Sequence, residues 1–215
     1  TEPEKTFEEV LDEHPVSIQV NGQWQTFPNA KAAEEASYEE YKANLRRNAK
    51  NFRITDEHLG EGGPKAKFQA NVNAIRLLKE LEAAGQQASP EQQEVLSRYV
   101  GWGGLSDAFD PEKPAWALEY AQLKELLTPE EYAAARSSTL NAHYTSPTVI
   151  QAIYEAVDRM GFETGNILEP SMGVGNFFGM LPEEMRNSRL YGVELDPVSG
   201  RIAKQLYPKA DITVG

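Results

Sequence analysis

The sequence predicts an α/β protein in which a doubly wound parallel sheet follows a mostly helical region and a small amino-terminal β-hairpin. Residues 141–215 alternate short apolar runs with amphipathic segments, as successive strand–helix units require. Residues 67–140 repeat apolar side chains at helical spacing, and residues 1–66 are polar with one alternating apolar stretch. We therefore expect three regions: a polar extension over 1–66, helices over 67–140 and the sheet over 141–215.

The polar extension should contain a hairpin and a surface helix. Apolar and polar residues alternate over 16–20, and Asn21-Gly22 is a strong turn signal. A two-residue turn would place Trp24 on the face opposite Val20, so we expect either a longer turn or a ribbon with apolar side chains on both faces. Residues 31–50 should form a helix on a solvated surface.

Caps mark the helix boundaries of the middle region. Ser89 and Thr128 are each followed by proline and, three positions on, by Gln92 or Glu131, which is the pattern of a capping box. Trp102 lies between them in "GWGG", where we expect it to fill a core gap rather than to stack on a base. An apolar stripe ahead of Gly85 predicts a further helix; its members are Phe68, Val72, Ile75, Leu78 and Leu81.

The carboxyl-terminal region contains three candidate strands separated by helices. A helix should begin at Pro147, capped by Thr145 or Ser146, with a buried stripe of Val149, Ile150, Ile153, Tyr154, Val157 and Met160. We expect strands at residues 166–169, in "RLYGVELD" and in "ADITV", and helices from Asn176 and in "PVSGRIAKQLY". This order is the beginning of a Rossmann-like sheet.

Composition narrows the classes of function. The net charge of -12 disfavours sequence-independent binding to nucleic acid, so this acidic chain should bind DNA weakly or not at all. Cysteine is absent, and the three histidines do not have the spacing of metal ligands. The sequence therefore does not favour a metal site. The sequence has no long apolar span and no secretory signal, which predicts a cytoplasmic protein that does not enter a membrane.

The stretch "ILEPSMGVGNF" predicts a ligand site where the first strand ends. A dinucleotide would favour a third glycine, but Phe178 occupies that position. Glu169 ends the first strand and Glu194 ends the second, and two carboxylates would repel a pyrophosphate. Charge therefore favours a cationic, phosphate-free ligand such as S-adenosylmethionine over NAD.

Three motifs resemble those of the adenine-specific DNA methyltransferases whose cofactor motifs precede the catalytic one. They are "NAHYTSPTVIQAI", "ILEPSMGVGNF" and "LYGVELDP", and they follow one another at the spacing of βα units. More loosely, "LGEGGPKAKFQANVNAIRLLKELE" and "RYVGWGGLSDAFD" resemble segments of large methylase–helicase proteins of bacterial conjugative and phage-like elements. The resemblance implies an S-adenosylmethionine cofactor and DNA as the partner of the full-length protein.

Carried over by position, the resemblance assigns the methionine part of the cofactor to five residues. Thr145 would hold the carboxylate and Glu169 would face the ammonium group. Ser171, Gly173 and Gly175 would wrap the methionine and ribose with their backbone.

The adenosine part is assigned to three further residues. Phe177 would line the cleft, Glu194 would bind the ribose hydroxyls and Leu195 would touch the adenine. Two positions depart from the family pattern: Met172 stands where small residues are usual, and Ser146 replaces a proline.

The family's catalytic signature, Asn or Asp followed by Pro-Pro and an aromatic residue, does not occur in the sequence. We therefore expect an amino-terminal fragment of a longer methyltransferase, inactive alone, with a truncated sheet whose last strand is an exposed edge. That edge would be covered by the helical region or paired with a second copy. The alternatives are a non-catalytic DNA-associated or antirestriction module of a mobile element, and a methyltransferase acting on RNA or protein.

Overall fold

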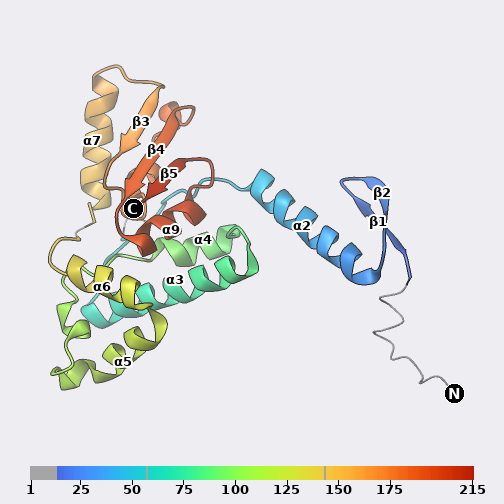
Figure 1. Ribbon diagram of the computed structural model, residues 1–215. Coiled ribbons are helices and arrows are strands. Elements are labelled where there is room, and N and C mark those ends of the chain that lie inside the picture. The colour runs from blue at the N-terminus through green and yellow to red at the C-terminus, as the bar shows by residue number, and fades with distance from the viewer. Residues whose placement is uncertain (1–13, 57, 143) are drawn as a thin grey trace. The chain divides into compact units, whose positions relative to one another are not determined.

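The computed structural model describes residues 14–56, 58–142 and 144–215 (Figure 1). They group into two compact units, one of residues 14–48 with 85–87 and the other of 49–84 with 88–215. The expected regions 67–140 and 141–215 thus fall mostly into the same unit, which contains the candidate site. Among the described helices, none is both long and apolar enough to span a bilayer.

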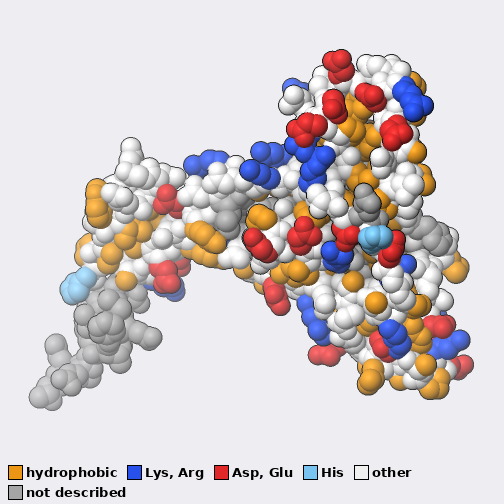
Figure 2. All heavy atoms as spheres, turned by 180° about the vertical axis from the view of Figure 1, so that it is seen from behind, with side chains coloured by type: hydrophobic (Ala, Val, Ile, Leu, Met, Phe, Trp, Pro, Cys, Tyr) orange, Lys and Arg blue, Asp and Glu red, His pale blue; other side chains and the backbone are white. Residues whose placement is uncertain are grey.

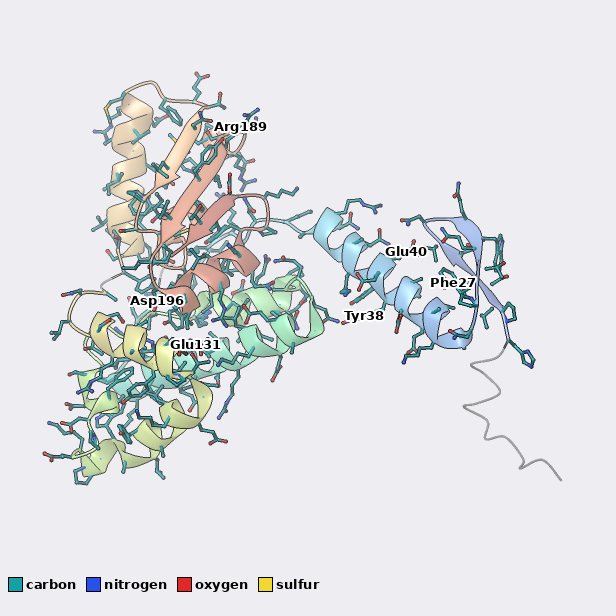
Figure 3. The ribbon with its side chains drawn as sticks, in the orientation of Figure 1. Phe27, Tyr38, Glu40, Glu131, Arg189 and Asp196 are labelled. Carbon is teal, nitrogen blue, oxygen red and sulfur yellow. The ribbon has the colours of Figure 1, made fainter. Side chains whose placement is uncertain are left out.

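The first unit is a hairpin packed on one helix. Strands β1 (Val16–Val20) and β2 (Gln23–Phe27) pair antiparallel, and helix α2 (Ala30–Asn48) follows. The turn has two residues, Asn21 and Gly22, both with positive φ, so the expectation of a longer turn was wrong. The alternative of a two-sided ribbon is confirmed, because Trp24 pairs with Gln19 and lies 71% exposed opposite Val20. Glu40 of α2 accepts a hydrogen bond from the Asn21 amide at 2.6 Å (Figure 3).

The helical part of the second unit has α3 (Pro64–Ala84), α4 (Pro90–Ser97), α5 (Ala117–Leu126) and α6 (Pro129–Ser138). Short 3-10 turns η1 (Ser106–Phe109) and η2 (Pro114–Trp116) lie between α4 and α5. Both predicted capping boxes are confirmed, with Ser89 and Thr128 each accepting from the backbone three positions on. Trp102 is 1% exposed and packs against Phe68 and Phe109, which confirms that it fills the core.

The parallel sheet follows helix α7 (Pro147–Arg159). Strands β3 (Asn166–Glu169), β4 (Arg189–Glu194) and β5 (Asp211–Val214) lie in sequence order, joined through α8 (Asn176–Gly179), η3 (Glu183–Met185) and α9 (Pro197–Leu206). All three predicted strands are confirmed. The chain is therefore a mixed α/β protein with a hairpin, a helical middle and a small parallel sheet.

One face of this sheet is buried and the other is open. Leu190 and Ile212 are both 8% exposed, whereas Leu168 is 62% exposed and Val193 36%. Parallel sheets in complete domains are usually covered on both faces, so the described residues cover only one. β3 and β5 are the two edges, each paired to β4 alone within the described part of the chain.

The predicted buried stripe of α7 is only partly correct. Ile150 and Tyr154 are buried and Val157 is partly buried, but Val149, Ile153 and Met160 are 49%, 42% and 77% exposed. The apolar stripe is wider than the contact that α7 makes with α8 and β3. Of the exposed members, Ile153 lines an apolar groove together with Leu168 of β3.

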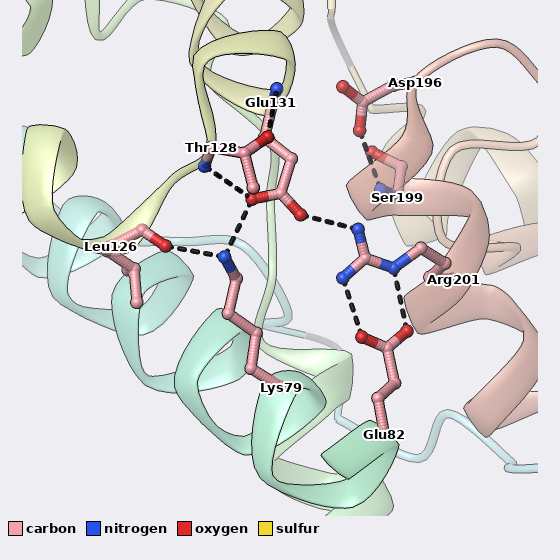
Figure 4. Close-up of polar contacts among 8 residues, drawn as sticks. All are labelled: Lys79, Glu82, Leu126, Thr128, Glu131, Asp196, Ser199 and Arg201. Atoms are coloured by element: carbon pink, nitrogen blue, oxygen red, sulfur yellow. Dashed lines mark hydrogen bonds and ion pairs between the residues drawn. The ribbon is translucent and has the colours of Figure 1, made fainter.

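An ion cluster around the buried Glu131 carboxylate ties the helices to the sheet region (Figure 4). Glu131 of α6 is 5% exposed and accepts hydrogen bonds from Arg201 of α9 at 2.6 Å and from Lys79 of α3 at 2.8 Å. Arg201 also binds both carboxylate oxygens of Glu82 at 2.7 Å. Burial acts to raise the pKa of Glu131, but the hydrogen bonds from Arg201 and Lys79 outweigh it and lower the pKa to about 2.

Removing the charge of Glu131 should destabilise the second unit. Glu131→Gln leaves Arg201 and Lys79 without their buried anion, and we expect a loss of about 2 kcal/mol in the free energy of unfolding. The matched control is Glu130→Gln, an exposed position in the same first helical turn, which should change stability by less than about 0.5 kcal/mol. Urea unfolding measures both, and equal effects of the two substitutions would show that the cluster contributes little.

Candidate functional site

A cavity of about 450 Å³ opens at the carboxyl ends of β3 and β4. This is where parallel α/β sheets bind their ligands, and the volume is in the range of small-molecule sites. The structure brings seven of the eight predicted residues together around it: Thr145, Glu169, Ser171, Gly173, Phe177, Glu194 and Leu195. Gly175 does not line the cavity.

Glu169 is the most unusual group in the cavity. It ends β3, and its Oε2 atom is fully buried without a hydrogen-bond partner. Burial, followed by the negative charge of Glu194, raises the pKa of Glu169 to about 8. A carboxyl group in this state would be stabilised by a cation placed against it.

Glu194 ends β4 and is held by backbone amides. Its Oε2 accepts from the Gly173 N–H at 2.6 Å, and its Oε1 accepts from the Asp196 N–H at 2.8 Å. Each carboxylate oxygen has a second lone pair, so both can still accept from a ligand hydroxyl. The side chain is thereby oriented before any ligand arrives, and it fixes the glycine turn to the second strand.

The glycines of the turn are required by protein packing. A Cβ on Gly173 would lie 2.6 Å from the Tyr144 ring, and one on Gly175 would lie 2.5 Å from the Tyr207 ring. Both glycines have positive φ. Both glycines thus make room for tyrosine rings, and Gly173 also lines the cavity.

Met172 is accommodated by a glycine of the neighbouring strand. Its side chain is 2% exposed, and its sulfur fills the space that a Cβ on Gly192 of β4 would need. The departure from the family pattern at Met172 is therefore matched by a glycine in the neighbouring strand.

The other predicted residues lie at the rim or on the wall. Thr145 and Ser171 are exposed, and Leu195 is 81% exposed. Phe177 is partly buried, and its ring packs edge-on against Tyr154 with centroids 6.0 Å apart. Ser146 is the N-cap residue of α7.

The charge of the wall is negative. Asp196 joins Glu169 and Glu194 on the lining and caps α9. It follows the carboxyl end of β4, whereas Arg189 begins that strand at its other end (Figure 3). No Lys or Arg is among the described residues that line the cavity. Three carboxyl groups without a cationic side chain disfavour phosphates and favour a positively charged ligand.

The helical region supplies an unexpected part of this wall. The predicted site residues all lie within 141–215, but five lining residues come from the helical region: Tyr99, Gly101, Ala134, Ser137 and Ser138. The glycines beside Trp102 were a signal in the sequence that pointed to the loop containing Gly101. Asp196, the N-cap residue of α9, and Ser199 in its first turn were also missed.

The described residues show no metal centre, and the face seen in Figure 2 carries charges of both signs. No group of three or more potential metal ligands occurs in the described ranges. Figure 2 shows acidic side chains spread over the face viewed from behind, with Lys and Arg interspersed among them. This distribution is in keeping with the net charge of -12.

Known proteins similar to this chain include two of viral origin. The chain is 24% identical over 155 residues to the Defense against restriction protein B of Escherichia phage P1, covering 72% of this chain and 5% of the phage protein. It is 46% identical over 43 residues to the type II methyltransferase M.CvrRI of Paramecium bursaria Chlorella virus XZ-6E, covering 20% of this chain and 11% of that enzyme. No protein-family model and no solved structure matches the chain. The chain thus spans a small part of both relatives and is distantly similar to a protein of defence against restriction and to a methyltransferase.

Proposed function

We propose that this chain is the S-adenosylmethionine-binding region of a DNA methyltransferase that modifies the exocyclic amine of adenine. The observation that carries the proposal is the unpartnered Glu169 carboxyl in a cavity whose described lining residues include no Lys or Arg. S-adenosylmethionine has an ammonium and a sulfonium group but no phosphate, so its charge complements this wall. The match to a type II methyltransferase supports the same reading.

The residues of the cavity fit this cofactor. Glu169 would accept from the ammonium group, and the free lone pairs of Glu194 would accept from the two ribose hydroxyls. Thr145 at the rim offers its hydroxyl to the methionine carboxylate, and the backbone of Ser171 and Gly173 would wrap the methionine and ribose. Leu195 offers an apolar contact to the adenine. When bound, the cofactor would supply the methyl group. We assign to this chain the binding of the cofactor and not the transfer, because the sequence has no Asn-Pro-Pro-aromatic signature.

A second candidate function is that of a non-catalytic module in defence against restriction. The similarity to the phage P1 protein, which covers 72% of this chain, favours it. Such a module would keep the fold without needing the cofactor. Cofactor binding by the chain therefore distinguishes the two candidates.

The chain should bind S-adenosylhomocysteine, and Glu169→Gln should weaken that binding about tenfold. The substitution preserves shape but removes the negative charge opposite the ammonium group, and a charge-assisted hydrogen bond contributes about 1.5–3 kcal/mol. Isothermal titration calorimetry measures both affinities.

The matched control for this titration is Glu163→Gln, an exposed carboxylate shortly before β3, which should leave the affinity unchanged. NAD and ATP should not bind to the cavity. Binding of NAD in preference to S-adenosylhomocysteine would overturn the proposal, and no binding by the folded chain would favour the module without cofactor.

Binding should also depend on pH. In the free protein Glu169 has a pKa of about 8, so it is mostly protonated at pH 6 to 7. A cationic ligand favours the charged form, so binding should release a proton and tighten as the pH rises from 6 to 8. Calorimetry in buffers of different ionisation enthalpy measures the released proton, and Glu169→Gln should abolish that part of the release.

The same carboxyl should make the free protein less stable at higher pH. Its pKa is raised by folding from 4.5 to about 8, so its contribution to stability is present below pH 4.5 and is lost as the pH rises through 8. Glu169→Gln should therefore stabilise the chain relative to wild type by about 4 kcal/mol more at pH 8.5 than at pH 4.5. A difference in unfolding free energy that does not vary with pH would contradict a buried, protonated Glu169.

A further inference from the structure

We propose that the glycine loop of the helical region, residues 99–104, positions the ligand-binding turn through the ring of Tyr144. Gly101 would then be a positioning residue of the site, although α5 and α6 lie between the loop and the ligand-binding turn in the sequence. The identity of the ligand in this inference rests on the proposed function, whereas the contact itself does not.

Tyr144 lies between two glycines that have no room for a side chain. A Cβ on Gly101 would be 2.5 Å from Cε2 of the ring, and a Cβ on Gly173 would be 2.6 Å from Cε1. The tyrosine hydroxyl is 3.1 Å from the Ser199 hydroxyl of α9. The ring therefore contacts the helical loop on one edge, the glycine turn on the other and α9 at its tip.

The helical loop is itself held firmly, so it can act as a support. The buried Asn71 of α3 donates to the Gly101 carbonyl at 2.6 Å and accepts from the Val100 amide at 2.9 Å. The Gly104 amide donates to the Thr139 carbonyl at 3.0 Å, just beyond α6. Both ends of the loop are thus fixed to helices.

The support continues into the site through hydrogen bonds. Gly173, which the ring contacts, donates its N–H to Glu194, the carboxylate assigned to the ribose. A displaced ring would move Gly173 and release Glu194 from one of its two backbone donors. The position of Glu194 therefore depends on Gly101, and the helical region contributes to the site through contact with the turn.

The chain contains a matched pair of glycines for testing this contact. Gly101 and Gly104 lie in the same loop with φ of 70° and 74°, but a Cβ on Gly104 would meet nothing within 4 Å. Gly101→Ala and Gly104→Ala thus impose the same backbone strain, and only the first clashes with Tyr144.

Two measurements on the 215-residue chain test the proposal. In the free chain, hydrogen exchange of residues 171–176 should become faster by about tenfold or more in Gly101→Ala and stay at the wild-type rate in Gly104→Ala. The affinity for S-adenosylhomocysteine should fall by about tenfold in Gly101→Ala and be unchanged in Gly104→Ala. Equal exchange rates in the two variants would overturn the proposal.

The outcomes separate this inference from the proposed function. If wild type does not bind S-adenosylhomocysteine, the proposed function fails, and the exchange rates of the free chain still decide whether Gly101 positions the turn. If Gly101→Ala does not fold, Tyr144→Ala replaces it, because that substitution removes the ring without adding a clash. Exchange of residues 171–176 should then accelerate in Tyr144→Ala, and an unchanged rate would overturn the proposal.

Discussion

The candidate site depends on keeping two carboxyl groups, Glu169 and Glu194, at neighbouring strand ends, with no Lys or Arg among the described residues of the cavity lining. The two carboxyl groups differ in their hydrogen bonding. Glu194 accepts two backbone hydrogen bonds, whereas the Oε2 atom of Glu169 accepts none. Burial and the charge of Glu194 make the ionised form of Glu169 unfavourable in the free protein. A cationic ligand would remove this unfavourable state, which links the chemistry of the ligand directly to the energetics of the fold.

The arrangement is maintained by contacts between elements that are distant in the sequence. The ion cluster of Glu131, Arg201, Lys79 and Glu82 joins α3, α6 and α9, and both α6 and α9 contribute to the cavity wall. Tyr144 adds a second link between the helical loop and the glycine turn. The helical region and the small sheet therefore form one compact unit around the site.

Local signals in the sequence were sufficient for most elements of secondary structure and for part of the site. Capping boxes at Ser89 and Thr128 marked helix starts, and alternating apolar runs marked the three strands, because these features are set by neighbouring residues. The exposure of Val149 and Ile153 could not be predicted, since it depends on which surfaces α7 meets. The contact of Tyr144 with Gly101 and Gly173 was also beyond reach, because it joins three segments that only the tertiary fold brings together. The roles assigned to individual cofactor-binding residues stay predictions.

The central claim is that the buried, unpartnered Glu169 carboxyl makes this cavity select a cationic ligand, and a change made to the ligand tests it most directly. The measurement is the ratio of the affinities of the chain for S-adenosylhomocysteine and for its deaminated counterpart, which lacks the ammonium group. We predict that loss of the ammonium group weakens binding by about tenfold or more at pH 8. Equal affinities for the two compounds, or tighter binding of the deaminated one, would contradict the account.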